Sequence, residues 1–416
     1  MNSFRSRCPF AHTLSVGAVA TTLLLSGCGA GGDESARADE PTKSGDHDHE
    51  LTSAKPRLVA TYEGGLHVLD AETLEVEESA ELDGFLRIHP AGDGRHVVVS
   101  TDDAFRVLDT GVWSEAHGDH EHYFATDPEL TDVEFEADHP GHVIHASGRT
   151  ALFSDGTGAA EVFATDDLAD GRPATRTVET SEPHHGAAVP VEGKGVLTTI
   201  GDDESAYGAR VRDGDGNEVT RSEECAGAHG AAPAARGHVV VGCEDGVLVY
   251  DGDTLEKLDS PDAYGRIGNQ AGTDSSAVVL GDYKVEPDAE LERPTRVSLI
   301  DTARQRIRLV EIGTSYSFRS LARGPSGEAI VLGTDGRLHV IDPRSGRITK
   351  RIAVIDKWRE PSDWQQPRPT LFVEGDAAYV TEPETDELHR VDLSKGEVTE
   401  STTLPDTPNE LAGVSG

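Results

Sequence analysis

Beyond residue 56, short apolar runs alternate with polar turns along the chain. The runs at residues 66–69 and 247–250 are each followed by an aspartate, a few turn residues and a second run, and Asp-Gly pairs precede several such units. Runs of this length between turn residues are typical of β-strands, and Asp-Gly is typical of hairpins. No stretch shows the apolar spacing of an amphipathic helix. The chain is therefore predicted to be almost entirely β.

The strand and aspartate unit recurs with a regular period. Its eight landmarks span 322 residues, or about 46 per unit, which is the period of a propeller blade; they are Asp70, Asp109, Asp167, Asp213, Asp251, Asp301, Asp342 and Asp392. Residues 409–413 resemble an innermost strand, and residues 57–83 would supply the rest of that blade. We predict one all-β propeller over residues 57–416, with eight blades favoured and seven as the alternative. The C-terminal strand would close the ring by joining the N-terminal blade.

The N-terminus has the features of an export signal. Arg5 and Arg7 precede an apolar stretch at residues 14–25, which is too short to span a bilayer comfortably. It ends in Leu-Ser-Gly-Cys, a pattern similar to the bacterial lipobox, in which Cys28 would be acylated. An ordinary cleaved signal with an incidental cysteine is the alternative. We predict a lipoprotein signal peptide over residues 1–27.

Residues 28–56 are acidic and poor in apolar residues, and are predicted to form a disordered tether. The tether contains His47 and His49, a weak and flexible chelating pair. Loss of the two signal arginines takes the formal charge from −39 to −41. A chain this acidic is repelled by nucleic acid and by anionic lipid surfaces, so we expect no nucleic acid partner. We expect it to contact the membrane only through a lipid anchor. We expect an exported monomer, lipid-anchored to the outer face of the cell membrane or periplasmic.

Two cysteines remain outside the signal and lipobox. Cys225 and Cys243 form an even pair in an oxidising compartment, so we predict a disulfide between them. The sequence contains no C-x-x-C motif, so a metal or redox role for these cysteines is not favoured.

Histidines supply the candidate chemistry, since six of the 18 lie between residues 117 and 145. Residues 117–123 read His-Gly-Asp-His-Glu-His-Tyr, which we interpret as a loop between the second and third blades. Neutral imidazoles are good ligands for zinc. The glycine would let His117 and His120 converge, and His120 and His122 share a face in an extended segment. Asp119 would ligate or orient an imidazole. A solvated polar loop is the alternative.

A second group of histidines occurs where two innermost strands are expected to begin, at one mouth of a central channel. His184 and His185 precede one such strand and His229 begins another. We expect His185 and His229 to occupy equivalent, inward-facing places on adjacent blades. The alternative is a pair of channel histidines bonded only to backbone or water.

Two further histidines lie three apart on one predicted strand, so they face opposite sides of it. His145 is the preferred ligand and His142 the expected packing residue. The isolated histidines are predicted to be structural: His67, His89, His96, His238, His339 and His389.

Four separate motifs, at residues 117–123, 142–158, 183–190 and 225–249, resemble the AztD-type zinc metallochaperones. The resemblance covers nearly all of the chain from residue 57. It implies an exported propeller that binds zinc and delivers it to the solute-binding protein of a zinc ABC transporter. It also implies that the ligands lie among His117, His120, His122, His142, His145, His184, His185 and His229.

The sequence therefore predicts a non-enzymatic zinc carrier with an exchangeable, mostly histidine site. A metalloenzyme resembling propeller lyases, with the same histidines, and a scaffold propeller with incidental histidines are the alternatives. No nucleophile elbow, H-E-x-x-H motif or cofactor fingerprint is present in the sequence.

Overall fold

The computed structural model describes residues 49–118 and 120–416, which belong to one compact unit. The predicted signal peptide, Cys28, His47 and Asp119 lie outside the described residues. Among the described residues we find no helix long and apolar enough to cross a bilayer.

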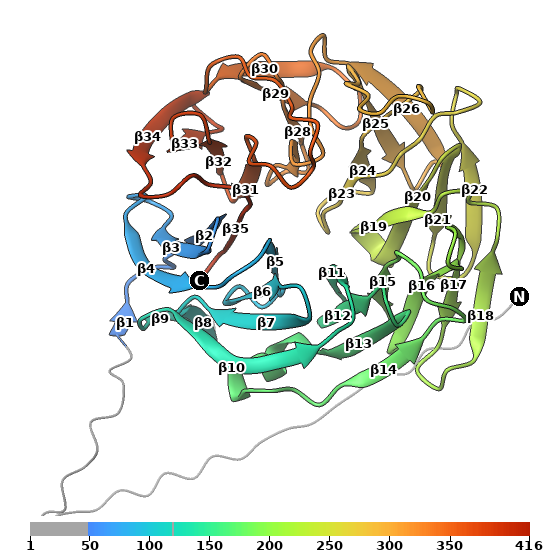
Figure 1. Ribbon diagram of the computed structural model, residues 1–416, viewed down its shortest axis with the longest axis horizontal. Coiled ribbons are helices and arrows are strands. Elements are labelled where there is room, and N and C mark those ends of the chain that lie inside the picture. Colours follow the sequence, from blue (N-terminus) through green and yellow to red (C-terminus); the bar gives the residue numbers. More distant parts are fainter. Residues whose placement is uncertain (1–48, 119) are drawn as a thin grey trace, which may run out of the picture. The chain divides into compact units, whose positions relative to one another are not determined.

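The unit is a ring of eight four-stranded antiparallel sheets, so it is a β-propeller (Figure 1). From the innermost strand outwards, blade 1 contains β35 (Leu411–Val414), β2 (Arg57–Tyr62), β3 (Gly65–Asp70) and β4 (Val76–Glu81). Blade 2 contains β5 (Arg87–Pro90), β6 (His96–Ser100), β7 (Ala104–Asp109) and β10 (Glu129–Glu136). Blade 3 contains β11 (Pro140–Ala146), β12 (Arg149–Ser154), β13 (Ala159–Ala164) and β14 (Arg176–Glu179). Blade 4 contains β15 (Ala188–Val191), β16 (Gly195–Gly201), β17 (Ala206–Arg212) and β18 (Glu218–Ser222).

The remaining four sheets continue the ring in sequence order. Blade 5 contains β19 (His229–Ala234), β20 (His238–Cys243), β21 (Gly246–Tyr250) and β22 (Leu255–Asp259). Blade 6 contains β23 (Gln270–Ala271), β24 (Val278–Gly281), β25 (Arg296–Asp301) and β26 (Arg306–Glu311). Blade 7 contains β27 (Leu321–Arg323), β28 (Ala329–Leu332), β29 (Arg337–Ile341) and β30 (Ile348–Ala353). Blade 8 contains β31 (Leu371–Glu374), β32 (Ala377–Glu382), β33 (Glu387–Asp392) and β34 (Glu397–Thr403).

The described helices are two short 3-10 segments, Thr165–Asp170 and Ala235–Gly237, in keeping with the predicted lack of helix. The ring closes as expected, because β35 pairs antiparallel with β2 from Arg57 opposite Val414 to Ala60 opposite Leu411. The eight four-stranded sheets equal the favoured number of blades.

The repeating aspartates have a local structural role. Seven of the eight end the third strand of a blade or follow it directly, and the remaining one, Asp167, lies in the 3-10 segment after β13. In Asp251 and Asp342 one carboxylate oxygen accepts the N–H groups of the residues two and three positions further on. Such Asx turns reverse the chain between the third and fourth strands. These turns account for the periodic signal in the sequence.

The hydrophobic core is divided among the contacts between blades. Eight buried clusters fill the ring, and each combines residues of two neighbouring blades. Val97, Val98 and Val99 of β6 illustrate the pattern, since alternate residues pack towards opposite neighbours. The outermost strands are polar instead: four of the six β4 residues are glutamate or serine, and all four are exposed. The surplus of carboxylates therefore lies towards the rim, for instance on β4 and β34.

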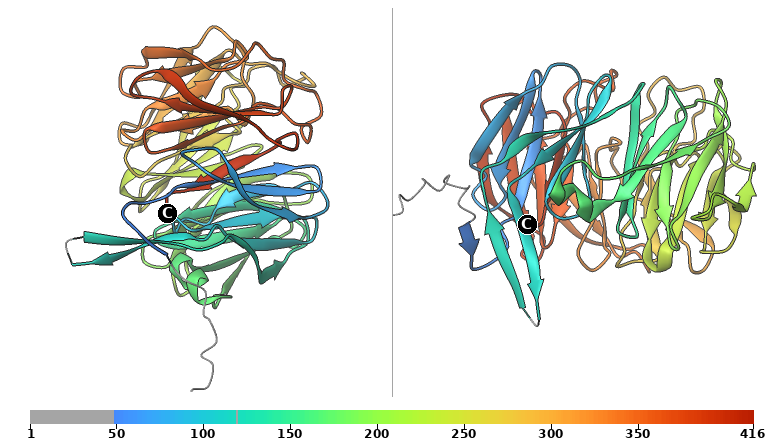
Figure 2. Two further views of the ribbon diagram at one scale, coloured as in Figure 1. Left: turned by 90° about the vertical axis from the view of Figure 1, so that its left-hand side faces the viewer. Right: turned by 90° about the horizontal axis from the view of Figure 1, so that it is seen from below.

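A ninth, three-stranded sheet departs from the expected architecture. It consists of β8 (Val112–His117), β9 (His120–Ala125) and β1 (His49–Leu51) in the order β1-β9-β8. The motif at residues 117–123 is thus not a loop between blades 2 and 3. It belongs to a hairpin inserted between the third and fourth strands of blade 2, and the hairpin projects beyond one face of the ring (Figure 2). Strand β1 also corrects the prediction that residues 28–56 lack structure throughout.

Candidate metal centres

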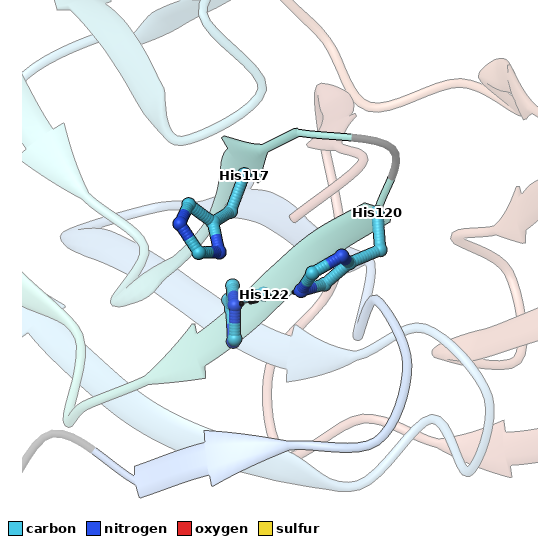
Figure 3. Close-up of side chains that lie close together, drawn as sticks. All are labelled: His117, His120 and His122. Atoms are coloured by element: carbon cyan, nitrogen blue, oxygen red, sulfur yellow. Dashed lines mark hydrogen bonds between the residues drawn. The ribbon is translucent and has the colours of Figure 1, made fainter. Parts of the chain in front are cut away.

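The first candidate centre lies on the projecting hairpin. His117 of β8 and His120 of β9 are directly opposite each other across the turn, where Gly118 has a φ of 69°. A positive φ suits the short hairpin turn and favours glycine. His122 lies two residues after His120 on the same face, and Figure 3 shows the three rings gathered together. The ligand nitrogens of these residues, the hairpin triad, lie within 4.8 Å of one another.

The N-terminal strand fixes the orientation of one ring in the hairpin triad. Glu50 of β1 lies 2.7 Å from Nδ1 of His122, measured to its Oε1 atom. A carboxylate only accepts, so Nδ1 carries the proton and Nε2 keeps its lone pair. That Nε2 atom lies 3.2 Å from Nε2 of His120.

The second candidate centre is formed by three consecutive blades. His142 lies on β11, His185 precedes β15 and His229 begins β19, so all three mark the starts of innermost strands. Their ligand nitrogens also lie within 4.8 Å of one another, and we call them the inner triad. Nε2 of His185 is 3.3 Å from Nε2 of His229.

Backbone irregularities aim two of these rings. The ladder between β11 and β12 shifts register between Pro140 and Val143, so His142 lies in a β-bulge. The ladder between β19 and β20 shifts beside His229, where Gly230 has a φ of 67°. Bulges re-aim side chains and are common beside functional sites.

Hydrogen bonds set the tautomers of the other two rings. Nδ1 of His185 lies 2.5 Å from Oδ2 of Asp155, and Nδ1 of His229 donates to the carbonyl of Gly268 at 2.7 Å. Both acceptors lack protons, so the Nε2 lone pairs of His185 and His229 remain free to bind a metal. Asp155 is itself held by the Gly186 N–H at 3.3 Å.

Burial favours the neutral form of two rings of the inner triad, His142 and His229. Burial lowers the pKa of His142 well below its usual range, and the positive potential of His229, His185 and Arg87 lowers it further. Burial likewise lowers the pKa of His229 to about 4, although the bond to Gly268 opposes the shift. The Nε2 atom of His142 is buried and has no hydrogen-bond partner among the described residues. A buried acceptor without a partner is costly unless a ligand satisfies it.

Both triads fit a tetrahedral zinc ion. Zinc bonds imidazole nitrogen at about 2.0–2.1 Å, so two ligand nitrogens of a tetrahedron lie about 3.3–3.4 Å apart. The Nε2 to Nε2 distances of 3.2 Å and 3.3 Å match this separation. Three imidazoles leave one tetrahedral position for a further ligand.

Two of the expected ligands lie elsewhere. His145 is exposed on β11 and packs over Gly92, where an added Cβ would lie 2.6 Å from the imidazole ring. His184 is buried, with Nε2 bonded to Thr199 at 2.8 Å and Nδ1 to the Glu182 carbonyl at 2.9 Å. The structure thus reverses the preference for His145 over His142: His142, which lies in the bulge, groups with His185 and His229, and His145 does not.

A third group of potential ligands is Glu382, Glu387 and His389. His389 is the third residue of its blade's third strand, as are His67 of β3 and His339 of β29. His67 and His389 both bond a serine hydroxyl through Nδ1 at 2.8 Å and a carboxylate through Nε2. The recurrence indicates a packing role repeated between blades.

Sequence reasoning missed the residues that orient the triads. Asp155 is part of an Asp-Gly turn and Glu50 follows His49 in the predicted tether, so neither position indicates a metal site in the sequence. His49 contributes its backbone to β1. The expected disulfide is present between Cys225 and Cys243.

Comparison with known proteins provides evidence that is independent of the geometry of the triads. The chain is 25% identical over 311 residues to Zinc chaperone AztD of Citrobacter koseri, a match that covers 74% of this chain and 73% of that protein. The crystal structure of Citrobacter koseri AztD superposes with a TM-score of 0.77 at 23% identity, covering 88% of this chain and 99% of that one. The resemblance to AztD-type zinc chaperones is confirmed.

A structure of apo AztD from the same organism superposes with a TM-score of 0.75 at 22% identity, covering 88% of this chain and 98% of that one. The dihydro-heme d1 dehydrogenase NirN shares the fold more distantly, with a TM-score of 0.53 at 12% identity, over 86% of this chain and 74% of that one. No family model matches the chain. The AztD structures thus support the propeller fold over 88% of the chain.

Proposed function

We propose that this protein is an extracytoplasmic zinc metallochaperone that carries zinc on the hairpin triad and the inner triad. The observation that carries the proposal is the convergence of two separate sets of three imidazoles, each within 4.8 Å. Similarity to a protein named as a zinc chaperone supports zinc as the cargo. The metalloenzyme alternative gains no support from that similarity, and we do not propose it.

The two triads suit different parts of a carrier's task. His117 and His120 are exposed on a projecting hairpin, so solvent and a partner protein can reach the metal. Imidazole ligands there can be replaced one at a time by ligands of a partner. His142 and His229 are largely shielded from solvent. Burial lowers the pKa of each ring, which keeps a nitrogen lone pair available for a metal. We propose exchange at the hairpin triad and retention at the inner triad.

The recipient in this proposal is the solute-binding protein of a zinc ABC transporter. We further propose that residues 1–27 are removed as a lipoprotein signal, that Cys28 is acylated, and that residues 57–416 act as a monomeric propeller at the outer face of the cell membrane. The lipobox motif and the oxidising environment implied by the Cys225–Cys243 disulfide support this location.

Zinc stoichiometry tests the proposal directly. The mature chain should bind two zinc ions in competition with a chromophoric chelator. His120→Ala with His122→Ala should leave one ion, and His185→Ala with His229→Ala should also leave one. His139→Ala is the matched control, because His139 is 82% exposed beside Asp138 and belongs to neither triad.

Transfer is measured by mixing the zinc-loaded chain with the apo solute-binding protein in the presence of excess chelator. Zinc should reach the recipient despite the chelator, and the hairpin variant should transfer more slowly. A wild-type chain that binds no zinc, or a hairpin variant that retains both ions, would contradict the assignment.

A further inference from the structure

The inner triad opens into a cavity with an unexpected charge. The cavity has a volume of about 360 Å³, and its lining includes Arg87, Arg266 and Lys284 but no carboxylate. The chain as a whole has a formal charge of −39. A positive surface around a zinc ion is electrostatically unfavourable, so the local reversal of charge requires a cause.

Arg266 and Lys284 lie directly opposite each other in an isolated antiparallel bridge, which brings two positive side chains close together. The Arg266 N–H donates to the Lys284 carbonyl at 2.9 Å and the Lys284 N–H donates to the Arg266 carbonyl at 3.0 Å. Side chains directly opposite in an antiparallel bridge face the same side, where like charges destabilise the pairing. Both side chains line the cavity.

Neighbouring carboxylates do not cancel this charge. Glu410 is shared between Arg87 and Arg319, at 3.1 Å from each. Glu244 lies 3.6 Å from Arg266, and both side chains are partly exposed. Within the described part of the chain, no carboxylate lies within ion-pair distance of Lys284.

Three other nearby acidic groups have partners of their own. Glu360 is paired with Arg368 at 3.0 Å, Asp155 holds His185, and Asp282 accepts the N–H groups of Gly268 and Asn269. Glu290 and Glu292 line a separate cavity with Lys284, so the excess of cations applies to the lining of the cavity at the inner triad, where no carboxylate is found.

We propose that an external carboxylate binds in this cavity and supplies the fourth ligand to zinc on the inner triad. One carboxylate oxygen would occupy the open tetrahedral position left by His142, His185 and His229. The other oxygen would accept from Arg266 or Lys284, which makes a charge-assisted hydrogen bond. The carboxylate belongs either to a free small acid or to a glutamate or aspartate of the partner protein. This inference rests on the proposed function, since it requires metal at the inner triad.

Cobalt(II) provides the test, because its visible absorption bands respond to a change of ligand. The full chain carrying His120→Ala and His122→Ala confines cobalt to the inner triad. Acetate should change the cobalt spectrum in a saturable manner. Lys284→Gln or Arg266→Gln should weaken acetate binding about tenfold. Lys284→Arg should restore it, and Lys395→Gln, a surface lysine paired with Asp392, is the matched control that should have no effect.

Two capped tripeptides distinguish the source of the carboxylate. If acetyl-Gly-Glu-Gly-amide binds more tightly than acetate, and acetyl-Gly-Gln-Gly-amide does not bind, the ligand is a protein side chain. If acetate binds at least as tightly as the glutamate peptide, the ligand is a free small acid.

A cobalt spectrum that no carboxylate changes would overturn the inference and leave the proposed function intact. Unaltered acetate affinity in both glutamine variants would likewise overturn it. Absence of any cobalt band in the hairpin variant would instead overturn the inner metal site, and the inference with it.

Discussion

Replacing His142 by leucine should have opposite effects on stability and on zinc binding. The Nε2 atom of His142 is buried without a hydrogen-bond partner among the described residues. Such an atom costs about 1–3 kcal/mol in the folded protein. Leucine removes this penalty, so the free energy of unfolding of the zinc-free protein should rise by about 1 kcal/mol. In a ring of this size that corresponds to an increase in Tm of about 1–2 °C.

The same substitution removes one of three protein ligands of the inner triad. Structural zinc sites with four ligands bind with about 10–16 kcal/mol, or about 3 kcal/mol for each ligand. Loss of one ligand should therefore weaken zinc binding at least 100-fold. Zinc should then no longer raise the Tm at concentrations that stabilise the parent chain.

Calorimetry with and without zinc measures both effects. The parent chain should carry His120→Ala and His122→Ala, so that the hairpin triad does not contribute. His145→Leu is the matched control on the same strand, and it should leave the zinc affinity unchanged. A fall in stability on His142→Leu would show that its ring serves packing. A loss of zinc binding in His145→Leu instead would refute the assignment of His142, rather than His145, to the inner triad.

Three further predictions concern the surroundings of the triads. Asp155→Asn should weaken zinc binding at the inner triad about 10- to 100-fold in chelator competition, because His185 would lose the carboxylate that orients it; an unchanged affinity would contradict this. Burial lowers the pKa of His89 from 6.5 to about 4, so the unfolded chain binds its proton first as the pH falls. The free energy of unfolding measured in urea should thus decrease from about pH 6.5 to about pH 4, and less steeply in His89→Gln. Removing the disulfide by Cys225→Ala and Cys243→Ala should lower that free energy by about 3 kcal/mol without changing zinc stoichiometry, whereas a change in stoichiometry would implicate the bond in the site.

The propeller was predictable because its signal is local and repeated. An Asx turn such as that of Asp251 needs only a few consecutive residues, and it returns in nearly every blade. The hairpin at residues 112–125 was not predictable in the same way, since an insertion inside blade 2 leaves the average period almost unchanged. The sequence identified the histidines of the hairpin triad as candidate ligands, but it did not predict the three-stranded sheet that carries them.

The prediction of which strand histidine joins the inner triad was wrong where the backbone departs from regular alternation. Strand spacing places His142 and His145 on opposite faces, and the choice between them depends on a bulge that sequence does not reveal. The orienting residues were missed for another reason. Asp155 precedes His185 by 30 positions and belongs to another blade, so only the closed ring brings the carboxylate and the imidazole together.

If the chain is exported as proposed, ring closure also bears on how it crosses the membrane. Blade 1 is complete only when β35 pairs with β2, and these strands come from opposite ends of the propeller sequence. During synthesis, β2 emerges long before its partner exists, so the first blade cannot assemble on the ribosome. A chain that remains open until its last strand is available stays suitable for threading through a translocation pore. Under the proposed export, folding and zinc loading would both begin on the far side of the membrane.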